Sequence, residues 1–218
     1  MITSGEFFNY KSATLFFGKK HDKNLIPLCT TVKQVHDNKV VIIENIHENN
    51  IEADALVTRL PNVNLCVKSA DCVPILLYSD NGIIAAAHAG WRGAASGIIQ
   101  NTIDVMVKLG GNTSMISAFI GPCIRKESYE VNENVFYSFT NVDKEQFFQR
   151  LTKTTFAFDL PGLCKNILAF EGISDIYDTL DNTYSQFDEF FSYRFYTKHD
   201  KILYDFERHP SIIRLNVI

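Results

Sequence analysis

The 218-residue sequence predicts one α/β (α+β) domain in which most strands pair antiparallel. A hydrophobic content of 46% allows one substantial core rather than several small ones. Short β-branched segments alternate with Asn, Asp, Gly and Pro turns through the middle of the chain, and amphipathic segments lie among them. No internal repeat, low-complexity segment or linker marks a boundary, so residues 1–218 are expected to form a single unit.

The strands are predicted from β-branched composition and flanking turn residues. Six apolar segments between residues 40 and 120 have this character: 40–43, 55–58, 64–68, 73–78, 83–88 and 115–120. Three late segments, at 190–195, 201–206 and 212–218, are also predicted to be strands. The order of these segments places most of the sheet in the middle of the chain.

Helices are predicted where apolar residues recur at three- and four-residue spacing. One helix is predicted within 93–112, where the apolar pattern ends at Gly110 and Gly111, a helix-stop signal. A second is predicted over 160–170, and segments 132–139 and 144–151 have weaker helical patterns.

The composition excludes several classes of partner. A formal net charge of −4 and a pI near 5.9 offer no basic surface for nucleic acid or an anionic membrane. No apolar run is long enough to span a membrane, and Glu6 interrupts the stretch that a signal peptide would need, so we expect a cytoplasmic protein with a small ligand. Five cysteines, an odd number, predict reduced thiols. Four histidines in polar stretches are predicted to be solvated: His21, His47, His199 and His209.

One predicted hairpin brings a cysteine and a histidine together. A three-residue turn at 80–82, with glycine at its last position, would pair Pro74 with His88. Cys72 would then lie diagonal to His88 on the same face, about 7–8 Å away between backbones. A two-residue turn would instead place the two side chains on opposite faces.

The flanks of this hairpin are rich in polar chemistry. Asp71 precedes Cys72, and Gly90, Trp91, Arg92 and Gly93 follow the histidine. A cysteine or histidine alone is more often a core residue, but an apolar core corner rarely holds so many polar groups. His36, just before a predicted strand, is a candidate third member of the site.

These motifs resemble the YfiH-like laccase-domain family, the multicopper polyphenol oxidases whose members are described as purine nucleoside phosphorylases. The matching stretches are QVH at 34–36 with Val40, DALVT at 54–58, ADCVPILL at 70–77, HAGWRG at 88–93, IGPCI at 120–124, YEV at 129–131 and FFSYR at 190–194. The resemblance implies that His36, Cys72 and His88 bind a metal, usually zinc, and that the fold is a four-layer α/β/β/α sandwich similar to that of certain cysteine hydrolases.

The side-chain types of the three implied ligands agree with a zinc site. Two imidazoles and one thiolate form a borderline-soft set suited to zinc, with copper as the alternative metal, and three protein ligands leave one position open. Only two of the six histidines lie in the matching motifs, so we see no ligand set for a multicopper cluster.

The resemblance implies phosphorolysis of adenosine, inosine or guanosine, and of methylthioadenosine, to base and ribose 1-phosphate, with adenosine deamination as a second activity. Cys72, His88 and Arg92 are the predicted catalytic residues, and Asp71, Arg92, Cys123 and Arg194 the predicted substrate contacts. Arg92 and Arg194 are candidates for holding phosphate, although Arg92 could instead pair with Asp71.

Three alternatives remain open at this level. One is a hydrolase that uses Cys72 as nucleophile and His88 as base, for example in peptidoglycan precursor editing. The others are polyphenol oxidase activity and a metal-binding protein without turnover.

Overall fold

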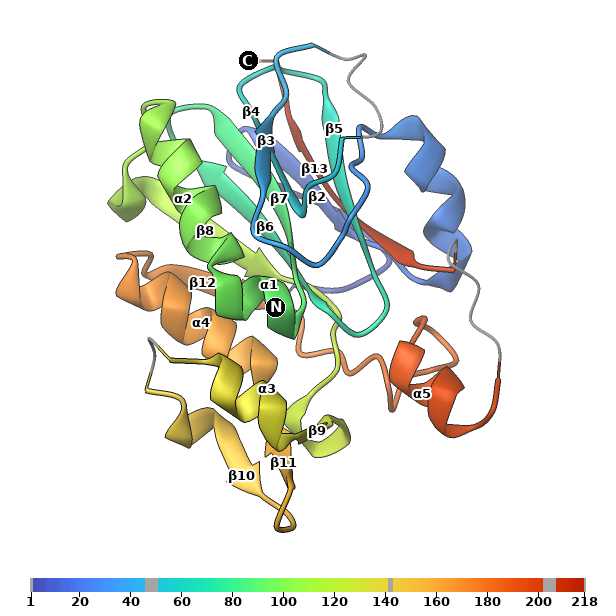
Figure 1. The fold of residues 1–218 in the computed structure, drawn as a ribbon. Helices are drawn as coiled ribbons and strands as arrows, with labels where there is room; N and C mark the ends of the chain where they lie inside the picture. Colours follow the sequence, from blue (N-terminus) through green and yellow to red (C-terminus); the bar gives the residue numbers. More distant parts are fainter. Residues whose placement is uncertain (1, 46–50, 141–142, 202–206, 218) are drawn as a thin grey trace.

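The computed structural model describes residues 2–45, 51–140, 143–201 and 207–217. Two large sheets lie face to face, and helices cover the far side of one of them (Figure 1). In chain order, the elements are β1 (Phe7–Tyr10), β2 (Ala13–Phe17), η1 (Lys20–Leu28), β3 (Val40–Ile42), β4 (Ala55–Thr58), β5 (Asn64–Ser69), β6 (Val73–Ser79), β7 (Ile83–Ala89), α1 (Trp91–Ser96), α2 (Ile98–Lys108), η2 (Thr113–Met115), β8 (Ile116–Ile120), η3 (Lys126–Ser128), β9 (Glu130–Asn132), α3 (Glu133–Ser138), η4 (Glu145–Phe147), β10 (Phe148–Arg150), β11 (Thr155–Phe158), α4 (Leu160–Phe170), β12 (Asp175–Asp178), α5 (Tyr193–Lys198) and β13 (His209–Leu215).

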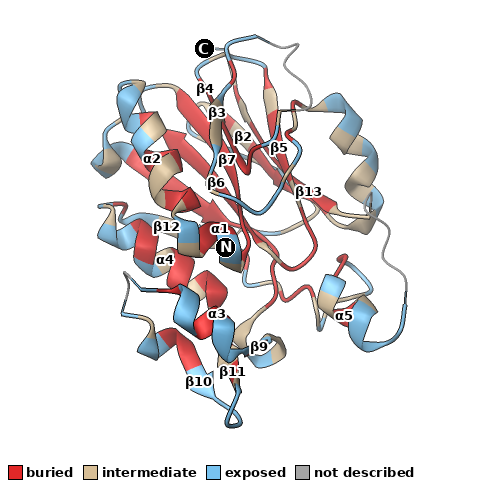
Figure 2. Ribbon diagram, viewed as in Figure 1, coloured by how far each residue is buried: buried red, intermediate tan, exposed pale blue. Residues whose placement is uncertain are grey.

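The six-stranded sheet has the order β12-β8-β6-β7-β4-β3. Its strands β6 and β7 are buried along their whole length, because α2 and α4 cover one face and the second sheet covers the other (Figure 2). Strands enclosed on both faces need apolar residues at nearly every position, which VPILLYS and IIAAAHA supply. The sheet is therefore the rigid centre of the molecule.

The four-stranded sheet has the order β1-β2-β13-β5. Its inner face contributes Leu15, Phe17, Leu65 and Ile213 to an apolar layer against Leu56, Leu76, Ile84 and Phe119 of the six-stranded sheet. Its outer face is covered by the 3₁₀ helix η1, whose Leu25 and Ile26 pack on Phe16, Cys66 and Ile212. The layers are helices, six-stranded sheet, four-stranded sheet and a 3₁₀ helix, which confirms the predicted mixed α/β class.

The hairpin register agrees with the three-residue turn. Ser79 pairs with Ile83, and Pro74 lies opposite His88. Gly82 has a φ of 70°, a left-handed conformation that glycine adopts without steric cost. The six strands predicted between residues 40 and 120 and the last strand, β13, all form.

The predicted helix within 93–112 is divided in two. Gly97, with a φ of 95°, ends α1 and begins α2, so the apolar stripe of α2 starts only at Ile98. The helices predicted over 160–170 and 132–139 form as α4 and α3.

Two predictions in the second half of the chain are wrong. Segment 144–151 holds a short 3₁₀ turn and strand β10 instead of a helix, because the Phe148 ring stacks on Phe158 of β11 at a centroid distance of 4.0 Å. Segment 190–195 leads into helix α5 rather than forming a strand, because the Ser192 hydroxyl caps the helix by accepting a hydrogen bond from the Phe195 amide at 3.1 Å.

Two of the remaining predictions concern residues that the structure does not describe, and a third is wrong. The strand predicted over 201–206 lies almost wholly outside the described residues, as does His47. His209, predicted to be solvated, is instead fully buried at the start of β13. Within the described ranges, no helix combines the length and the apolar character needed to cross a membrane.

Candidate metal centre and active site

Three side chains from separate parts of the chain meet at one end of the hairpin. His36 lies in the loop before β3, Cys72 directly precedes β6, and His88 is the next-to-last residue of β7. Their ligand atoms all lie within 4.8 Å of one another, and the two imidazole centroids are 4.9 Å apart. The structure thus brings together the three residues that the sequence motifs single out as metal ligands.

The protonation states favour a thiolate at this centre. Burial alone would raise the pKa of the Cys72 thiol, but the charge of His88 and hydrogen bonds with His36 and His88 lower it to about 6. Burial disfavours the imidazolium form of His88, yet the Cys72 charge and the hydrogen bond with Asp54 raise its pKa to about 9. In the protein without metal, Cys72 and His88 therefore form a thiolate–imidazolium pair near neutral pH.

Asp54 joins the histidine of β7 to the loop that carries His36. This carboxylate is fully buried and accepts a hydrogen bond from the Nδ1 of His88 at 2.8 Å. It also accepts the backbone amides of Val35, His36 and Asp37 at 3.1, 3.0 and 2.8 Å. Because a carboxylate only accepts, Nδ1 of His88 carries the proton and Nε2 is left for the centre. The sequence analysis quoted Asp54 in a matching motif without giving it a role.

Backbone geometry at the centre is also specialised. His36 has a φ of 63°, in the left-handed region that non-glycine residues seldom occupy, and the Asp54 hydrogen bonds hold it there. A Cβ atom on Gly90 would lie 3.0 Å from Sγ of Cys72 and 3.1 Å from Cδ2 of His36. The residue after β7 is therefore glycine because a side chain there would crowd two of the three ligands.

The centre opens into a cavity of about 720 Å³. This volume lies within the range of small-molecule sites. Besides His36, Cys72 and His88, the cavity is lined by an apolar and aromatic wall that includes Trp91, Ile124, Tyr129, Leu160 and Tyr193. It is also lined by five cationic side chains: Lys33, Lys68, Arg92, Arg194 and Arg208. The sequence analysis quoted Tyr129 in a matching motif without giving it a role. It did not single out the two lysines or Arg208, because their positions depend on pairing between distant segments.

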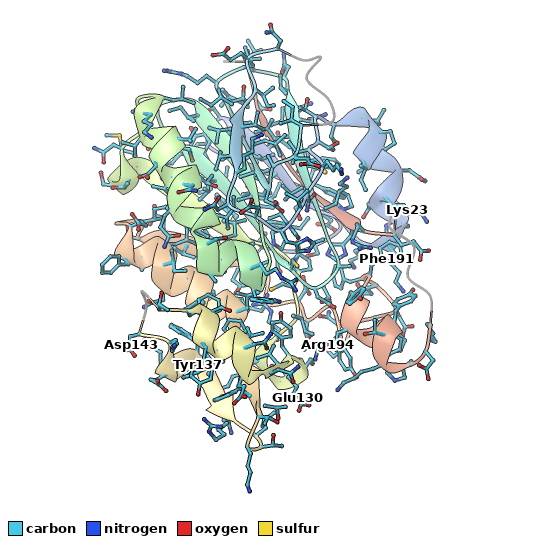
Figure 3. All side chains as sticks on the ribbon, in the orientation of Figure 1. Lys23, Glu130, Tyr137, Asp143, Phe191 and Arg194 are labelled. Atoms are coloured by element: carbon cyan, nitrogen blue, oxygen red, sulfur yellow. The ribbon has the colours of Figure 1, made fainter. Side chains whose placement is uncertain are left out.

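The two predicted anion-binding arginines both line this cavity. Arg92 is exposed, and its guanidinium lies 4.5 Å from the centroid of the Trp91 ring. Arg194 donates from Nη1 to the Glu130 carbonyl at 2.6 Å and lies 5.3 Å from the Tyr129 ring (Figure 3). Among the described residues, Arg92 makes no ion pair with Asp71.

Asp71 lines the cavity and is also hydrogen-bonded to the C-terminal segment. Its carboxylate is buried and accepts the Thr183 hydroxyl at 2.7 Å and the Arg194 backbone amide at 2.6 Å. Burial raises its pKa, and these hydrogen bonds oppose that effect. Asp71 therefore fixes the segment that carries Arg194 next to Cys72.

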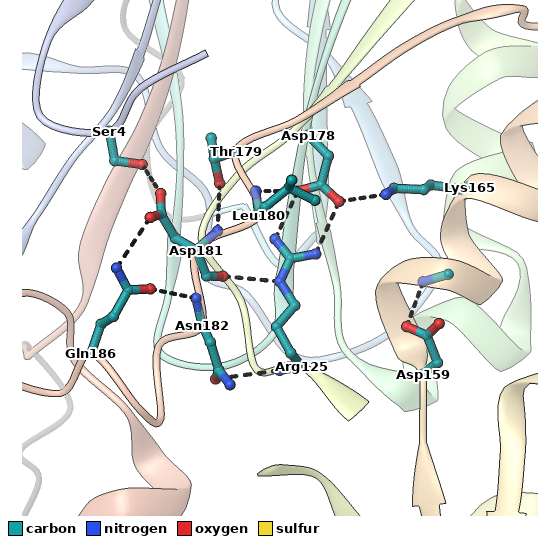
Figure 4. Close-up of polar contacts among 11 residues, drawn as sticks. Ser4, Arg125, Asp159, Lys165, Asp178, Thr179, Leu180, Asp181, Asn182 and Gln186 are labelled. Carbon is teal, nitrogen blue, oxygen red and sulfur yellow. Dashed lines mark hydrogen bonds and ion pairs between the residues drawn. The ribbon is translucent and has the colours of Figure 1, made fainter. Parts of the chain in front are cut away.

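Cys123 does not line the cavity. The thiol is fully buried, and burial raises its pKa to about 12, so it is a protonated core residue. Two residues further on, Arg125 forms a two-point ion pair with Asp178 at 2.7 and 2.9 Å and donates to the Asp181 carbonyl at 2.9 Å (Figure 4). This network fixes the loop that presents Ile124 to the cavity.

The layered α/β fold and a His–Cys–His cluster that could hold a metal ion define the class of the protein, a laccase-like domain. Residues 21–202 match the family described as "Multi-copper polyphenol oxidoreductase laccase", and the chain belongs to this family. The resemblance inferred from the sequence motifs is confirmed.

Several relatives of this chain have the same name, purine nucleoside phosphorylase. The chain is 37% identical over 158 residues to a protein of Rickettsia prowazekii named purine nucleoside phosphorylase, a match that covers 71% of this chain and 65% of the relative. It is 37% identical to a Rickettsia conorii protein of the same name, covering 81% and 72%, and 32% identical to the Escherichia coli purine nucleoside phosphorylase YfiH, covering 75% and 67%.

Solved structures share the fold. A Neisseria meningitidis protein superposes with a TM-score of 0.83 at 25% identity, covering 97% of this chain and 99% of its own. The YfiH protein of Bacillus licheniformis has the same TM-score at 23% identity, covering 95% and 94%. The layered architecture is therefore common to these proteins.

Proposed function

We propose that this chain is a purine nucleoside phosphorylase that converts adenosine, inosine or guanosine, and methylthioadenosine, with phosphate to a free base and ribose 1-phosphate. The observation that carries the proposal is the cavity, in which a thiolate–imidazole centre adjoins both an aromatic wall and several cations. The names of the Rickettsia and Escherichia relatives support the same reaction.

The donor set fits a metal ion, and zinc best. Cys72 supplies a preformed thiolate, His88 presents Nε2 because Asp54 holds its Nδ1, and His36 completes three converging ligands. Bound there, the metal would supply Lewis-acid chemistry. Within the described residues this is the single cluster of at least three potential ligand side chains, which favours one ion over several coppers. Copper remains the alternative metal for the same ligands.

Other residues of the cavity bind the two reactants of phosphorolysis, the phosphate and the nucleoside. Arg92 and Arg194 bind the phosphate and hold it beside the sugar, since guanidinium groups match phosphate geometry. The wall formed by Tyr129, Ile124 and Leu160 packs on the purine and excludes water. Holding both reactants in one cavity supplies much of the rate enhancement by orientation.

A second candidate is a cysteine hydrolase. Here Cys72 attacks the substrate and His88 transfers the proton, and the thiolate–imidazolium pair is the specific observation that favours it. We rank it second because a nucleophile–base pair has no need of His36, which the structure places at the same centre.

The deciding experiment is product analysis of the metal-loaded protein. Adenosine and inosine are incubated with and without phosphate, and the bases, sugar phosphates and deaminated nucleosides are separated. The proposal expects base and ribose 1-phosphate only when phosphate is present. Base release without phosphate would refute phosphorolysis, inosine from adenosine would reveal deamination as a second activity, and metal binding without any product would identify a non-catalytic protein.

A further inference from the structure

The cavity carries more positive charge than one phosphate ion requires. Five cations line it, whereas the single acidic side chain among the lining residues is Asp71, whose carboxylate already accepts hydrogen bonds from Thr183 and Arg194. The whole chain has a formal net charge of −4, so the sign of the charge in the cavity is opposite to that of the chain as a whole. A cleft lined by one sign of charge attracts ligands of the opposite sign.

These cations fall into two groups. The first, Arg92 and Arg194, lies around Tyr129: both guanidinium charges act to lower the pKa of the Tyr129 phenol, against the stronger effect of burial. Arg194 is held there through its hydrogen bond to the Glu130 carbonyl. This pair comes from the beginnings of α1 and α5.

The second group, which we call the Lys68 edge, consists of Lys33, Lys68 and Arg208. Gln34 binds the backbone of Lys68 twice, donating to its carbonyl and accepting its amide, both at 2.8 Å, which places Lys33 beside β5. Lys68 pairs with Pro210 of β13, and Arg208 directly precedes the first residue of that strand, so both side chains line the cavity from the same end of the β5–β13 pair.

Within the Lys68 edge, Lys68 is the side chain best placed to bind an anionic ligand. Lys33 is exposed and forms an ion pair with Glu52 at 2.8 Å. The Lys68 ammonium, by contrast, makes no hydrogen bond or ion pair with any residue in the described part of the chain, although it lines the cavity and is half-buried. A half-buried ammonium that meets no carboxylate is stabilised by an anionic ligand.

We propose that the Lys68 edge is a second anion subsite, and that the chain accepts purine nucleoside 5′-monophosphates as well as nucleosides. The inference rests on the proposed phosphorolysis, in which the arginine pair holds the free phosphate and the Lys68 edge holds the phosphate attached to the ribose. The bond between C1′ and N9 breaks, a bond from C1′ to an oxygen of the free phosphate forms, and the base leaves with the proton of that phosphate. The products are the base and ribose 1,5-bisphosphate.

The test compares adenosine 5′-monophosphate (AMP) with adenosine. Calorimetry without phosphate measures binding of each compound, and product analysis with phosphate measures kcat/KM for each. Lys68→Gln should reduce the ratio of AMP to adenosine, in affinity and in kcat/KM, by about tenfold or more, the usual effect of losing one charge-assisted hydrogen bond. Lys108→Gln is the matched control, because this exposed lysine ends α2 away from the cavity, and it should leave the ratio unchanged.

Three outcomes overturn the subsite: wild-type protein that binds AMP no tighter than adenosine, an equal loss for both compounds in Lys68→Gln, or a tenfold loss of affinity for inorganic phosphate alone in that variant. The last outcome would assign the Lys68 edge to the free phosphate. Lys68-dependent binding of AMP without nucleoside turnover would refute the proposed function and support the subsite. Phosphorolysis of nucleosides without AMP binding would support the proposed function and refute the subsite.

Discussion

The two halves of the cavity are built in different ways. The metal half depends on one hairpin and a single buried carboxylate: His88 stands on the buried strand β7, Cys72 directly precedes β6, and Asp54 holds the loop that carries His36. The substrate half depends on a C-terminal segment that reaches Cys72 through hydrogen bonds to Asp71. The first half is set by sheet register, and the second by a small number of polar contacts. The chemistry at the metal half should therefore be more resistant to change than the substrate range.

Removing a ligand tests the metal half most severely. Cys72→Ala and His36→Ala should each weaken metal binding by far more than about tenfold and abolish phosphate-dependent base release, because three ligands have no redundancy. Metal content by elemental analysis and turnover are measured on folded protein, with Cys29→Ala as a control at a cysteine outside the centre. His36→Ala with wild-type turnover would favour Cys72 as a nucleophile.

Asp54→Asn should have the next largest effect. The amide cannot accept from His88 and three backbone amides as the carboxylate does, so metal affinity should fall by about 10–100-fold while the ligands remain present. Competition with a coloured chelator measures the affinity. An unchanged affinity would mean that the hairpin alone positions His88.

Asp71→Asn tests whether the two halves are separable. Its amide nitrogen would face one of two donors, the Thr183 hydroxyl or the Arg194 amide, and this should displace Arg194. We expect the KM for phosphate to rise about tenfold, since a hydrogen bond to a charged group contributes about 1.5–3 kcal/mol. Metal content should stay at the wild-type level. Loss of metal together with phosphate affinity would show that the two halves are one unit.

The smallest effect on activity is expected at His209, which is not among the residues that line the cavity and whose protonation should change stability instead. His209 is buried against Ser69 at 3.1 Å and Phe190 at 5.5 Å, and burial lowers its pKa from 6.5 to about 3. Because the unfolded chain binds this proton at higher pH than the folded one, the free energy of unfolding should decrease as pH falls from 6.5 towards 3.

The comparison for this prediction is His209→Gln. Denaturant unfolding curves at several pH values should show a shallower acid dependence in the variant than in the wild type. Equal slopes would assign the acid sensitivity to other groups.

Local signals predicted one half of the site well. The three-residue turn ending at Gly82 sets the pairing of Pro74 with His88, and both belong to strands whose composition is unambiguous. The sequence therefore predicted that Cys72 and His88 would converge. The position of His36 followed from its motif, not from any geometry that the sequence alone provides.

The other half could not be predicted, because its contacts join residues far apart in the chain. Ser192 caps a helix that hydrophobic composition suggested was a strand, and Arg194 reaches Asp71 across more than half of the sequence. Cys123 was predicted to contact substrate, but β-strand packing encloses it and only its neighbour Ile124 reaches the cavity. Lys68 and Arg208 come to line the same cavity only when β5 pairs with β13.

Asp54 holds His88 of β7 and the loop that carries His36 in one place, so the three proposed metal ligands meet only in the folded chain. Metal binding would therefore stabilise the folded state. His36, Cys72 and His88 converge only after β4, β6 and β7 have assembled, so a metal ion that needs all three binds the folded chain and not the unfolded one. Metal at a hundred times its dissociation constant would then add about 2.7 kcal/mol to stability. Protein made during metal shortage would unfold more often and be removed faster by proteases, so its abundance would follow the metal supply.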